Sequence, residues 1–475
     1  MQDIEKEVKL GLEANKSQYA IEQELSEKGF LHDDVQKAIA NVVGKYEKSR
    51  QTEEKGNENK FVLTELLDRI GYGFGSQQYI NILFLQSGAG LFLIGVVNCI
   101  RVVLSSLLSV FVDKYAHENT VSRKVIGMSG IMYGFCFILM AIARAIQSLP
   151  LFVFAVVVGA IGVVSYGELY KRLLRDVLKD EKRGLLKLIY NYGLIVTVAV
   201  LLAGAYLFDH LKIVPIGVDL FGNQVIFSVP GYLLVFELAA ICFIISGYVL
   251  SFIREKEVVK KADTFWSKIG AYFREVRKGS VLVKSKLALA LVFAGSVKGL
   301  VQVLGSCYYG IFIYQSFMNQ GFGGFMNVAM IFVLALISSL VTPMLTKENT
   351  KAYGKFPMLI FGTVLMAIMP LTYFFNPNLI SIAMGTILGV IGAAIAGIAE
   401  GFLAVEILPP DLRQRFFEMN SFVTAVPYLI TMPIGAYVGH VYGLNVLFLV
   451  LGITLLVFVL PVYFVIMVLQ EMKRI

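Results

Sequence analysis

Twelve long apolar segments constrain this 475-residue chain more than any other feature. A helix needs about 20 residues to cross the hydrocarbon core of a bilayer. Apolar and aromatic residues make up 57% of the chain and charged residues 16%, against about 25% charged in soluble domains. This composition excludes an ordinary soluble enzyme and a disordered chain. The expected spans lie near 64–88, 91–112, 126–146, 150–170, 188–208, 230–253, 286–314, 324–345, 356–375, 379–404, 417–438 and 443–469.

The first 60 residues differ in composition from the rest, with 10 Lys or Arg and 13 Asp or Glu. Apolar residues recur there at helical spacing, which predicts a small three-helix cytoplasmic module over 1–46. The module is similar in spacing to ubiquitin-associated three-helix modules. It could bind a cytoplasmic partner or pack against the inner loops. Residues 47–60, rich in Glu, Lys, Asn and Gly, are expected to form a flexible linker.

Basic residues in the loops predict the topology. With the N-terminus inside, the inner loops and the C-terminal tail hold 27 Lys or Arg, whereas the outer side has Lys212 and, at a helix end, Arg144. We therefore expect a multi-pass protein of the plasma membrane with both termini cytoplasmic. This distribution also explains the basic composition through contact with anionic lipid headgroups, so no nucleic-acid partner is expected. The longest inner loop, 254–285, contains a predicted amphipathic helix and separates a half at 61–253 from a half at 286–475.

An offset of 230 residues relates the two halves. Gly75-Ser76 with Tyr79 matches Gly305-Ser306 with Tyr309. Because six helices separate the copies, both have the same orientation in the membrane. The expected fold is therefore an all-α membrane protein with two pseudo-symmetric six-helix halves. Over roughly 61–470 this architecture resembles the major facilitator superfamily of secondary transporters, which implies alternating access around a site between the halves.

The loop after the second span is similar to a degenerate form of that family's signature. Asp113 keeps the acidic position, Lys114 replaces an arginine and Ser109 replaces a glycine, with Arg123 further along. The resemblance implies that Asp113 and Arg123 lock one conformation rather than contact the substrate. The alternative is ordinary loop charge at the inner leaflet.

Ionisable residues inside spans are costly and are candidates for function. Asp68 and Lys298 occupy equivalent positions in the repeat, which predicts an ion pair between the halves that closes an inner gate. Arg101, in the middle of span two, would bind an anionic group of the substrate or pair with an acid such as Glu168. Glu400 is the better candidate for proton coupling and Glu168 the weaker one. Glu168 has an alternative as the ion-pair partner of Lys171 or Arg172, one turn on.

Polar side chains concentrate in spans one and seven, where facing lipid would be expensive and a hydrated cavity would not. Together with the intramembrane cations they form the predicted substrate site: Gln77, Gln78, Asn81, Arg101, Lys298, Gln302 and Tyr309.

The sequence favours a secondary active transporter of a small solute, and its intramembrane carboxylates make proton coupling an option. The alternatives are a non-transporting receptor or scaffold that acts through residues 1–46, and a lipid or amphiphile exporter. We expect neither an enzyme nor a cofactor, because no phosphate-binding loop is present and the histidines do not converge with a nucleophile. No metal site is expected either, because the four cysteines are widely spaced within apolar runs.

Overall fold

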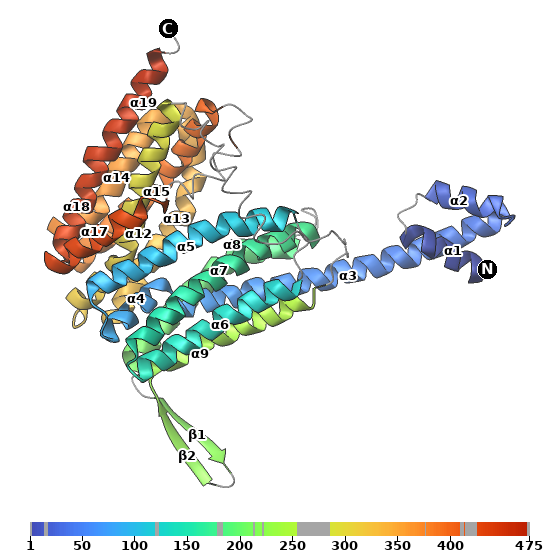
Figure 1. The fold of residues 1–475 in the computed structure, drawn as a ribbon, viewed down its shortest axis with the longest axis horizontal. Helices are drawn as coiled ribbons and strands as arrows, with labels where there is room; N and C mark the ends of the chain where they lie inside the picture. Colours follow the sequence, from blue (N-terminus) through green and yellow to red (C-terminus); the bar gives the residue numbers. More distant parts are fainter. Residues whose placement is uncertain are drawn as a thin grey trace.

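The computed structural model describes residues 2–13, 18–118, 123–177, 184–211, 214–220, 223–253, 286–375, 377–408, 413 and 425–472. Figure 1 shows a helical body of two halves and a small head at the end of a long helix. The predicted amphipathic helix within 254–285 lies outside the described residues.

The head consists of α1 (Gln2–Glu13), α2 (Gln18–Glu27) and the first turns of α3 (His32–Phe74). These helices pack around a small apolar cluster, spaced as the helical periodicity of the sequence requires: Ile4, Val8, Ile21, Leu25, Val35, Ala38, Ile39 and Val42.

The predicted flexible linker at 47–60 is wrong in its conformation, since α3 runs through it as one helix of 43 residues. The segment contains Gly56 but no proline, and its Glu, Lys and Gln residues are good helix formers. The charged, weakly hydrophobic composition that suggested a flexible linker is therefore compatible with a continuous solvent-exposed helix. Figure 1 shows α3 reaching from the head into the helical body.

The first half continues after α3 with the short helix α4, five long helices and a hairpin. Its elements are α4 (Gln77–Gln86), α5 (Leu91–Glu118), α6 (Arg123–Ala145), α7 (Leu149–Val177), α8 (Gly184–His210), β1 (Val214–Leu220), β2 (Asn223–Val229) and α9 (Gly231–Ser251). The strands pair antiparallel from Val214 opposite Val229 to Leu220 opposite Asn223. The purely helical prediction missed this hairpin, whose alternating Val, Ile and Phe residues favour strands.

The second half repeats the arrangement with helices only in its described part. Its elements are α12 (Lys286–Phe317), α13 (Gly324–Tyr353), α14 (Lys355–Phe375), α15 (Leu379–Ile407), α17 (Tyr428–Val441), α18 (Leu444–Thr454), the π-helical turn η2 (Leu455–Val459) and α19 (Leu460–Met472).

Ten of the twelve predicted spans are confirmed as described helices long and apolar enough to cross a membrane. The other two, near 64–88 and 417–438, stay predictions. The first is divided between the charged end of α3 and the short α4. The second is described from residue 425 onward, where α17 has 14 residues.

A break at Gly75-Ser76 divides the first predicted span. Gly75 follows the last residue of α3, and Ser76 has an extended backbone before α4 begins. A Cβ atom at Gly75 would lie 2.5 Å from the ring of Phe137, so this close approach requires glycine. The repeat does not preserve the break, because α12 continues through Gly305-Ser306.

The two halves meet at one end of the body and diverge at the other. Contacts between them run from α4 to α12, from α5 to α17 and from α8 to α13. Figure 1 shows the halves diverging on the side from which α3 extends to the head, with the hairpin on the opposite side. We call the hairpin side outer and the α3 side inner, following the predicted topology.

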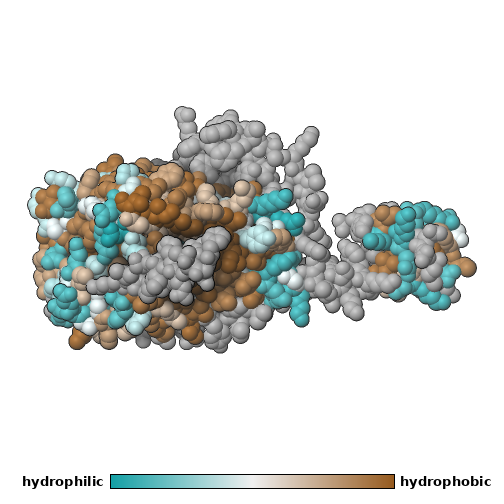
Figure 2. Space-filling view, turned by 90° about the horizontal axis from the view of Figure 1, so that it is seen from below, coloured by the Kyte–Doolittle hydropathy of each residue, from teal (hydrophilic) through white to brown (hydrophobic). Residues whose placement is uncertain are grey.

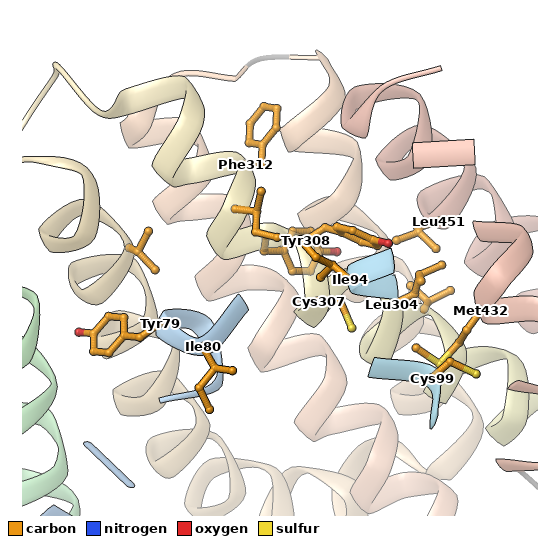
Figure 3. Packing of buried hydrophobic residues seen from close by; sticks show 14 of the residues in the cluster. Tyr79, Ile80, Ile94, Cys99, Leu304, Cys307, Tyr308, Phe312, Met432 and Leu451 are labelled. Atoms are coloured by element: carbon orange, nitrogen blue, oxygen red, sulfur yellow. The ribbon is translucent and has the colours of Figure 1, made fainter. Parts of the chain in front are cut away.

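Buried apolar residues form one continuous core across the closed end. Figure 3 shows Ile94 and Cys99 of α5 close to Leu304 and Tyr308 of α12 and to Met432 of α17. On the surface, Figure 2 shows hydrophobic residues over the middle of the body and hydrophilic residues toward its ends. This distribution fits a body surrounded by lipid, and with the ten apolar helices it makes the chain a multi-pass membrane protein.

Candidate functional site

Aromatic rings from both halves seal the outer end. Phe208 of α8 stacks on Phe325 of α13 with ring centroids 4.4 Å apart, and Tyr79 of α4 lies 5.8 Å from Phe325. Tyr314 of α12 lies 4.9 Å from the same ring and accepts a hydrogen bond from Gln86 at 2.7 Å. We call Tyr79, Phe208, Asp209, Tyr314 and Phe325 the outer gate.

Asp209 adds a polar contact to this gate. Its carboxylate, near the end of α8, accepts hydrogen bonds from the backbone N–H groups of Phe325 at 3.1 Å and Met326 at 2.7 Å. These N–H groups belong to the first turn of α13, where a helix leaves donors unsatisfied and favours negative charge. One half therefore caps a helix of the other. Sequence reasoning missed Asp209, although an acid at the outer end of a span facing the Gly323-Gly324 turn was a usable signal.

A chain of amides links the halves on the inner side of the gate. Gln77 donates to the Oδ1 atoms of Asn81 at 3.0 Å and Asn98 at 3.3 Å, and Asn98 donates to Asn81 at 3.1 Å. Asn81 in turn donates to the backbone carbonyl of Cys307 in α12 at 3.2 Å. We call Gln77, Asn81 and Asn98 the amide chain. Beside it, Gln78 donates to the carbonyl of Ser306 at 3.1 Å.

Both ends of the amide chain fix its direction. The carbonyl of Cys307 can only accept, so Asn81 presents its NH₂ group to it and its oxygen to the other amides. At the opposite end Arg101 can only donate, and its Nη1 atom bonds Oε1 of Gln77 at 2.7 Å. Three predicted substrate-site residues, Gln77, Asn81 and Arg101, therefore belong to one ordered network, and Gln78 lies next to it.

Arg101 does not pair with Glu168, so that predicted alternative is wrong. Glu168 lies near the inner end of α7 and binds Lys171 at 3.0 Å, as the other reading of the sequence held. Within the described residues Arg101 forms no ion pair, and its Nε atom is buried without a hydrogen-bond partner. Its side chain is half-buried, near Cys307 of α12 and Tyr133 of α6.

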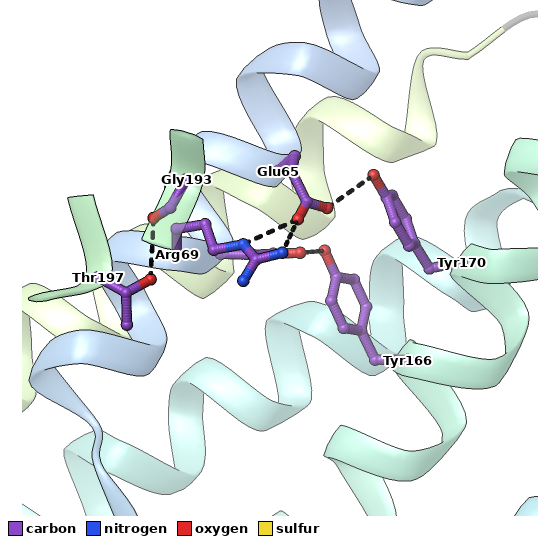
Figure 4. Close-up of polar contacts among 7 residues, drawn as sticks. Glu65, Arg69, Tyr166, Tyr170, Gly193 and Thr197 are labelled. Carbon is purple, nitrogen blue, oxygen red and sulfur yellow. Dashed lines mark hydrogen bonds and ion pairs between the residues drawn. The ribbon is translucent and has the colours of Figure 1, made fainter. Parts of the chain in front are cut away.

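Asp68 lies in a cluster of hydroxyl groups within the first half. It is 6% exposed and accepts hydrogen bonds from Tyr166 of α7 and Ser246 of α9, each at 2.7 Å. Figure 4 shows Tyr166 beside the neighbouring ion pair of Arg69 with Glu65, which measures 2.9 Å. We call Asp68, Tyr166 and Ser246 the Asp68 cluster.

Lys298 forms an ion pair with Glu400 of α15 inside the second half. The Lys298 side chain is 9% exposed and that of Glu400 17%. A buried pair of this kind loses hydration on both ions, and each needs the other to stay charged. A Cβ atom at Gly295 would lie 3.0 Å from Oε1 of Glu400. The absence of a side chain at this position of α12 therefore leaves room for the carboxylate.

The predicted Asp68–Lys298 ion pair is absent in this conformation, because both side chains are satisfied within their own halves. The 230-residue repeat makes their positions equivalent along the sequence, but the inner ends of the halves diverge. The 230-residue offset relates positions along two helices, but it does not give the distance between the two helix bundles.

The predicted signature residues lie at the inner end of the first half. Arg123 donates to the backbone carbonyl of Ile253, just beyond the end of α9, and Lys60 donates to that of Phe252 at 2.6 Å. Cations at a helix C-terminus satisfy its free carbonyls. Arg123 thus contacts its own half here, while the side chain of Asp113 lies outside the described residues.

Besides Lys298 and Gln78, two further predicted substrate-site residues lie outside the amide chain. Tyr309 is buried in an aromatic cluster of the second half, 4.6 Å from Tyr373 and 5.0 Å from Phe448 between ring centroids, and its part in substrate binding stays a prediction. Gln302 is exposed on α12. The sequence analysis also passed over Glu237, a half-buried carboxylate in α9.

Comparisons with known proteins identify the architecture. No protein-family model matches the chain, and no curated protein matches it in sequence. Solved structures do match. The nucleoside transporter NupG has a TM-score of 0.64 at 12% identity, covering 87% of this chain and 99% of that one. A bacterial homologue of the iron transporter ferroportin, in an inward-facing state, has a TM-score of 0.63 at 14% identity, covering 86% and 98%.

A POT family transporter in complex with 5-aminolevulinic acid matches with a TM-score of 0.58 at 12% identity, over 86% of this chain and 95% of that one. Identities this low establish a likeness of fold. The two halves, the contacts that join them and these neighbours agree. This chain therefore shares its fold with these solved transporter structures, as the resemblance noted in its sequence implied.

Proposed function

We propose that the protein is a secondary active transporter that moves a small solute by alternating access, with both termini in the cytoplasm and the plasma membrane as its location. One observation carries the proposal. The hydrogen bonds described between the halves lie at the outer gate, along the amide chain and its neighbour Gln78, and where α5 contacts α12 and α17. The described polar groups at the inner end bond within their own halves. A body closed at one end and divided at the other is one state of an alternating-access cycle.

The opposite state requires the outer contacts to break. They include single hydrogen bonds and ring contacts, each worth about 0.5–1.5 kcal/mol, together with the apolar packing of α5 against α12 and α17. In that state the inner ends approach, and Asp68 and Lys298 are the residues of opposite charge at equivalent positions of the repeat. We retain their pairing as a proposal for the inner-closed state.

Glu400 is our proposed proton carrier. It is half-buried within the second half and holds Lys298. Protonation would remove the charge that binds Lys298, which would then need a new partner such as Asp68. Proton binding would therefore favour closure of the inner end. Glu400→Gln should abolish uptake driven by a pH gradient while solute exchange continues. Gradient-driven uptake that survives Glu400→Gln would remove this role.

A reversible lock at the outer gate tests alternating access. Gln86 and Tyr314 touch across the halves through the ends of long side chains. Gln86→Cys with Tyr314→Cys, in a background without native cysteines, should therefore be bridged through disulfide bonds by a short bis-thiosulfonate reagent that spans the distance lost with the side chains. Transport in proteoliposomes should stop and should recover on reduction. Thr386→Cys with Tyr373→Cys is the matched control, since those hydroxyls lie 3.3 Å apart within one half. Equal transport by the cross-linked and reduced outer pair would contradict the proposed cycle and favour a scaffold.

A further inference from the structure

Arg101 lies deep in the apolar body without a compensating acid. It is ten residues into α5, which begins at the outer side, or about 15 Å along the helix. The other described cation well inside a span, Lys298, is paired with Glu400. A charge at this depth is retained where it has a counter-ion or reaches water. Arg101 has neither a carboxylate within the described residues nor complete burial.

The guanidinium group has donors to spare. It carries five N–H bonds in a fixed plane, and one of them reaches Oε1 of Gln77. Its Nε atom is buried without an acceptor. An oxyanion takes two parallel N–H bonds from arginine, and such charge-assisted pairs are about twice as strong as neutral ones. An oxyanion such as a carboxylate or phosphate would both accept hydrogen bonds from the unused N–H groups and supply the missing negative charge.

The hydrogen bonds around Arg101 argue against a purely structural role. The amide chain turns an oxygen toward the guanidinium and directs its own NH₂ groups to Asn81, Asn98 and the carbonyl of Cys307. An amide oxygen orients the cation without neutralising it. Arg101 is therefore held in place by Gln77 at the junction of α4, α5 and α12, with its charge still available.

We propose that Arg101 binds the transported solute through a carboxylate or phosphate group, so that the substrate is a small organic anion. This inference rests on the proposed transport function and gives it a substrate class. It also connects binding to the outer gate. An anion on Arg101 competes for the proton donors that hold Gln77, and Gln77 belongs to the chain that joins α4 to α12 through Asn81.

Binding to purified full-length protein tests the proposal without any transport step. The probes are two matched panels, small mono- and dicarboxylates and small phosphate esters, with neutral and cationic analogues of similar size. Thermal unfolding in detergent detects binding because a ligand that binds the folded state stabilises it, with an effect that grows as the logarithm of ligand concentration above Kd. We expect stabilisation from one or both anion panels and from neither control panel. Which anion panel responds distinguishes carboxylate from phosphate recognition.

Two variants assign the binding to Arg101. Arg101→Lys keeps the charge but loses the planar pair of donors, and the affinity should fall on the order of 10- to 100-fold. Gln77→Glu places a carboxylate where an oxygen already accepts from Nη1 at 2.7 Å, and this built-in anion should abolish binding. The control is Gln315→Glu, which adds the same charge at an exposed position of α12 that belongs to no predicted site and should leave binding intact.

Phenylglyoxal modification of the unmutated protein keeps the test valid if a variant fails to fold. The anion that stabilises the protein should protect Arg101, located by peptide mass spectrometry. Stabilisation by neutral or cationic solutes, anion binding that persists in Gln77→Glu, or no response to either anion panel would overturn the proposal. These outcomes leave alternating access untouched, because the cross-linking test does not depend on the charge of the solute.

Discussion

The two ends of the helical body satisfy their polar groups in different ways. At the outer end, Asp209 caps a helix of the opposite half and Asn81 donates to its backbone. At the inner end, Asp68 and Lys298 find partners in their own half. Inner contacts therefore stabilise each bundle separately, whereas outer contacts set how the bundles are arranged. Substitutions at the inner end should change stability, and those at the outer end should change the conformational equilibrium.

The largest expected effect comes from breaking the buried ion pair. Lys298→Met leaves Glu400 charged and unpartnered, and should destabilise the protein by about 3–5 kcal/mol. The double variant Lys298→Met with Glu400→Leu removes both charges and should recover most of the loss. Thermal and denaturant unfolding in detergent measure this. A double variant as unstable as the sum of the singles would show that the pair is not one unit.

A methyl group between the halves should act on the conformation. A Cβ atom at Gly95 of α5 would lie 2.3 Å from both Cβ of Ala436 in α17 and the hydroxyl of Tyr308. Gly95→Ala should therefore disfavour the outer-closed state by about 1–3 kcal/mol. An impermeant thiol reagent reports the shift by its rate of labelling a cysteine introduced at Phe208 of the outer gate, in a background without the native cysteines.

Gly397→Ala is the matched control for that substitution, because a Cβ atom there meets nothing within 4 Å. It should leave both labelling and stability nearly unchanged. Equal labelling of the Gly95→Ala and Gly397→Ala proteins would remove the α5–α17 contact from the outer closure.

Neutralising Asp68 should cost less than breaking the ion pair. In Asp68→Asn the side-chain oxygen still accepts one hydroxyl hydrogen bond, and Ser246 can rotate to accept from the new NH₂ group. We expect a loss of about 1–2 kcal/mol in unfolding free energy. This loss should be compared with the loss in unfolding free energy of Lys298→Met, measured in the same detergent. A loss as large as that of Lys298→Met would mean that Asp68 has a charged partner, against the cluster described.

The smallest effect contrasts two helix caps. Asp209 caps α13 from the other half, whereas Asn378 caps its own helix α15 through the N–H of Ser381 at 2.8 Å. Each substitution to alanine should cost about 1 kcal/mol. Asp209→Ala should also raise outer-gate labelling, and Asn378→Ala should not. If both or neither changed labelling, the outer cap would have no special part in closing the body.

The sequence predicted much of this arrangement because membrane helices obey strong composition rules. Ten of twelve spans, the equivalence of the halves and the polar face at Gln77, Gln78, Asn81 and Arg101 followed from residue types and spacing. Polar side chains inside a bilayer must converge on one another or on water, so their clustering could be anticipated.

Partners were harder to predict than positions. Asp68 was expected to meet Lys298, yet Tyr166 and Ser246 hold it, since the rotation of each helix within its bundle decides which neighbour a side chain reaches. Tyr309 followed Tyr79 in the repeat but faces an aromatic core in the second half. The linker at 47–60 was misjudged because charged residues suit a solvated helix as well as a disordered segment.

Because α3 is one continuous helix, a rotation at its membrane end is transmitted to the head. One end of this helix lies in the head and the other stops at the Gly75-Ser76 break beside the amide chain. A straight helix of its 43 residues is about 65 Å long. A rocking of the first span by about 10° would then sweep the far end through roughly 10 Å, by the geometry of a rod that length. In the proposed alternating-access cycle, a fluorophore pair between the head and the second half would report each conformational change as a large change in distance.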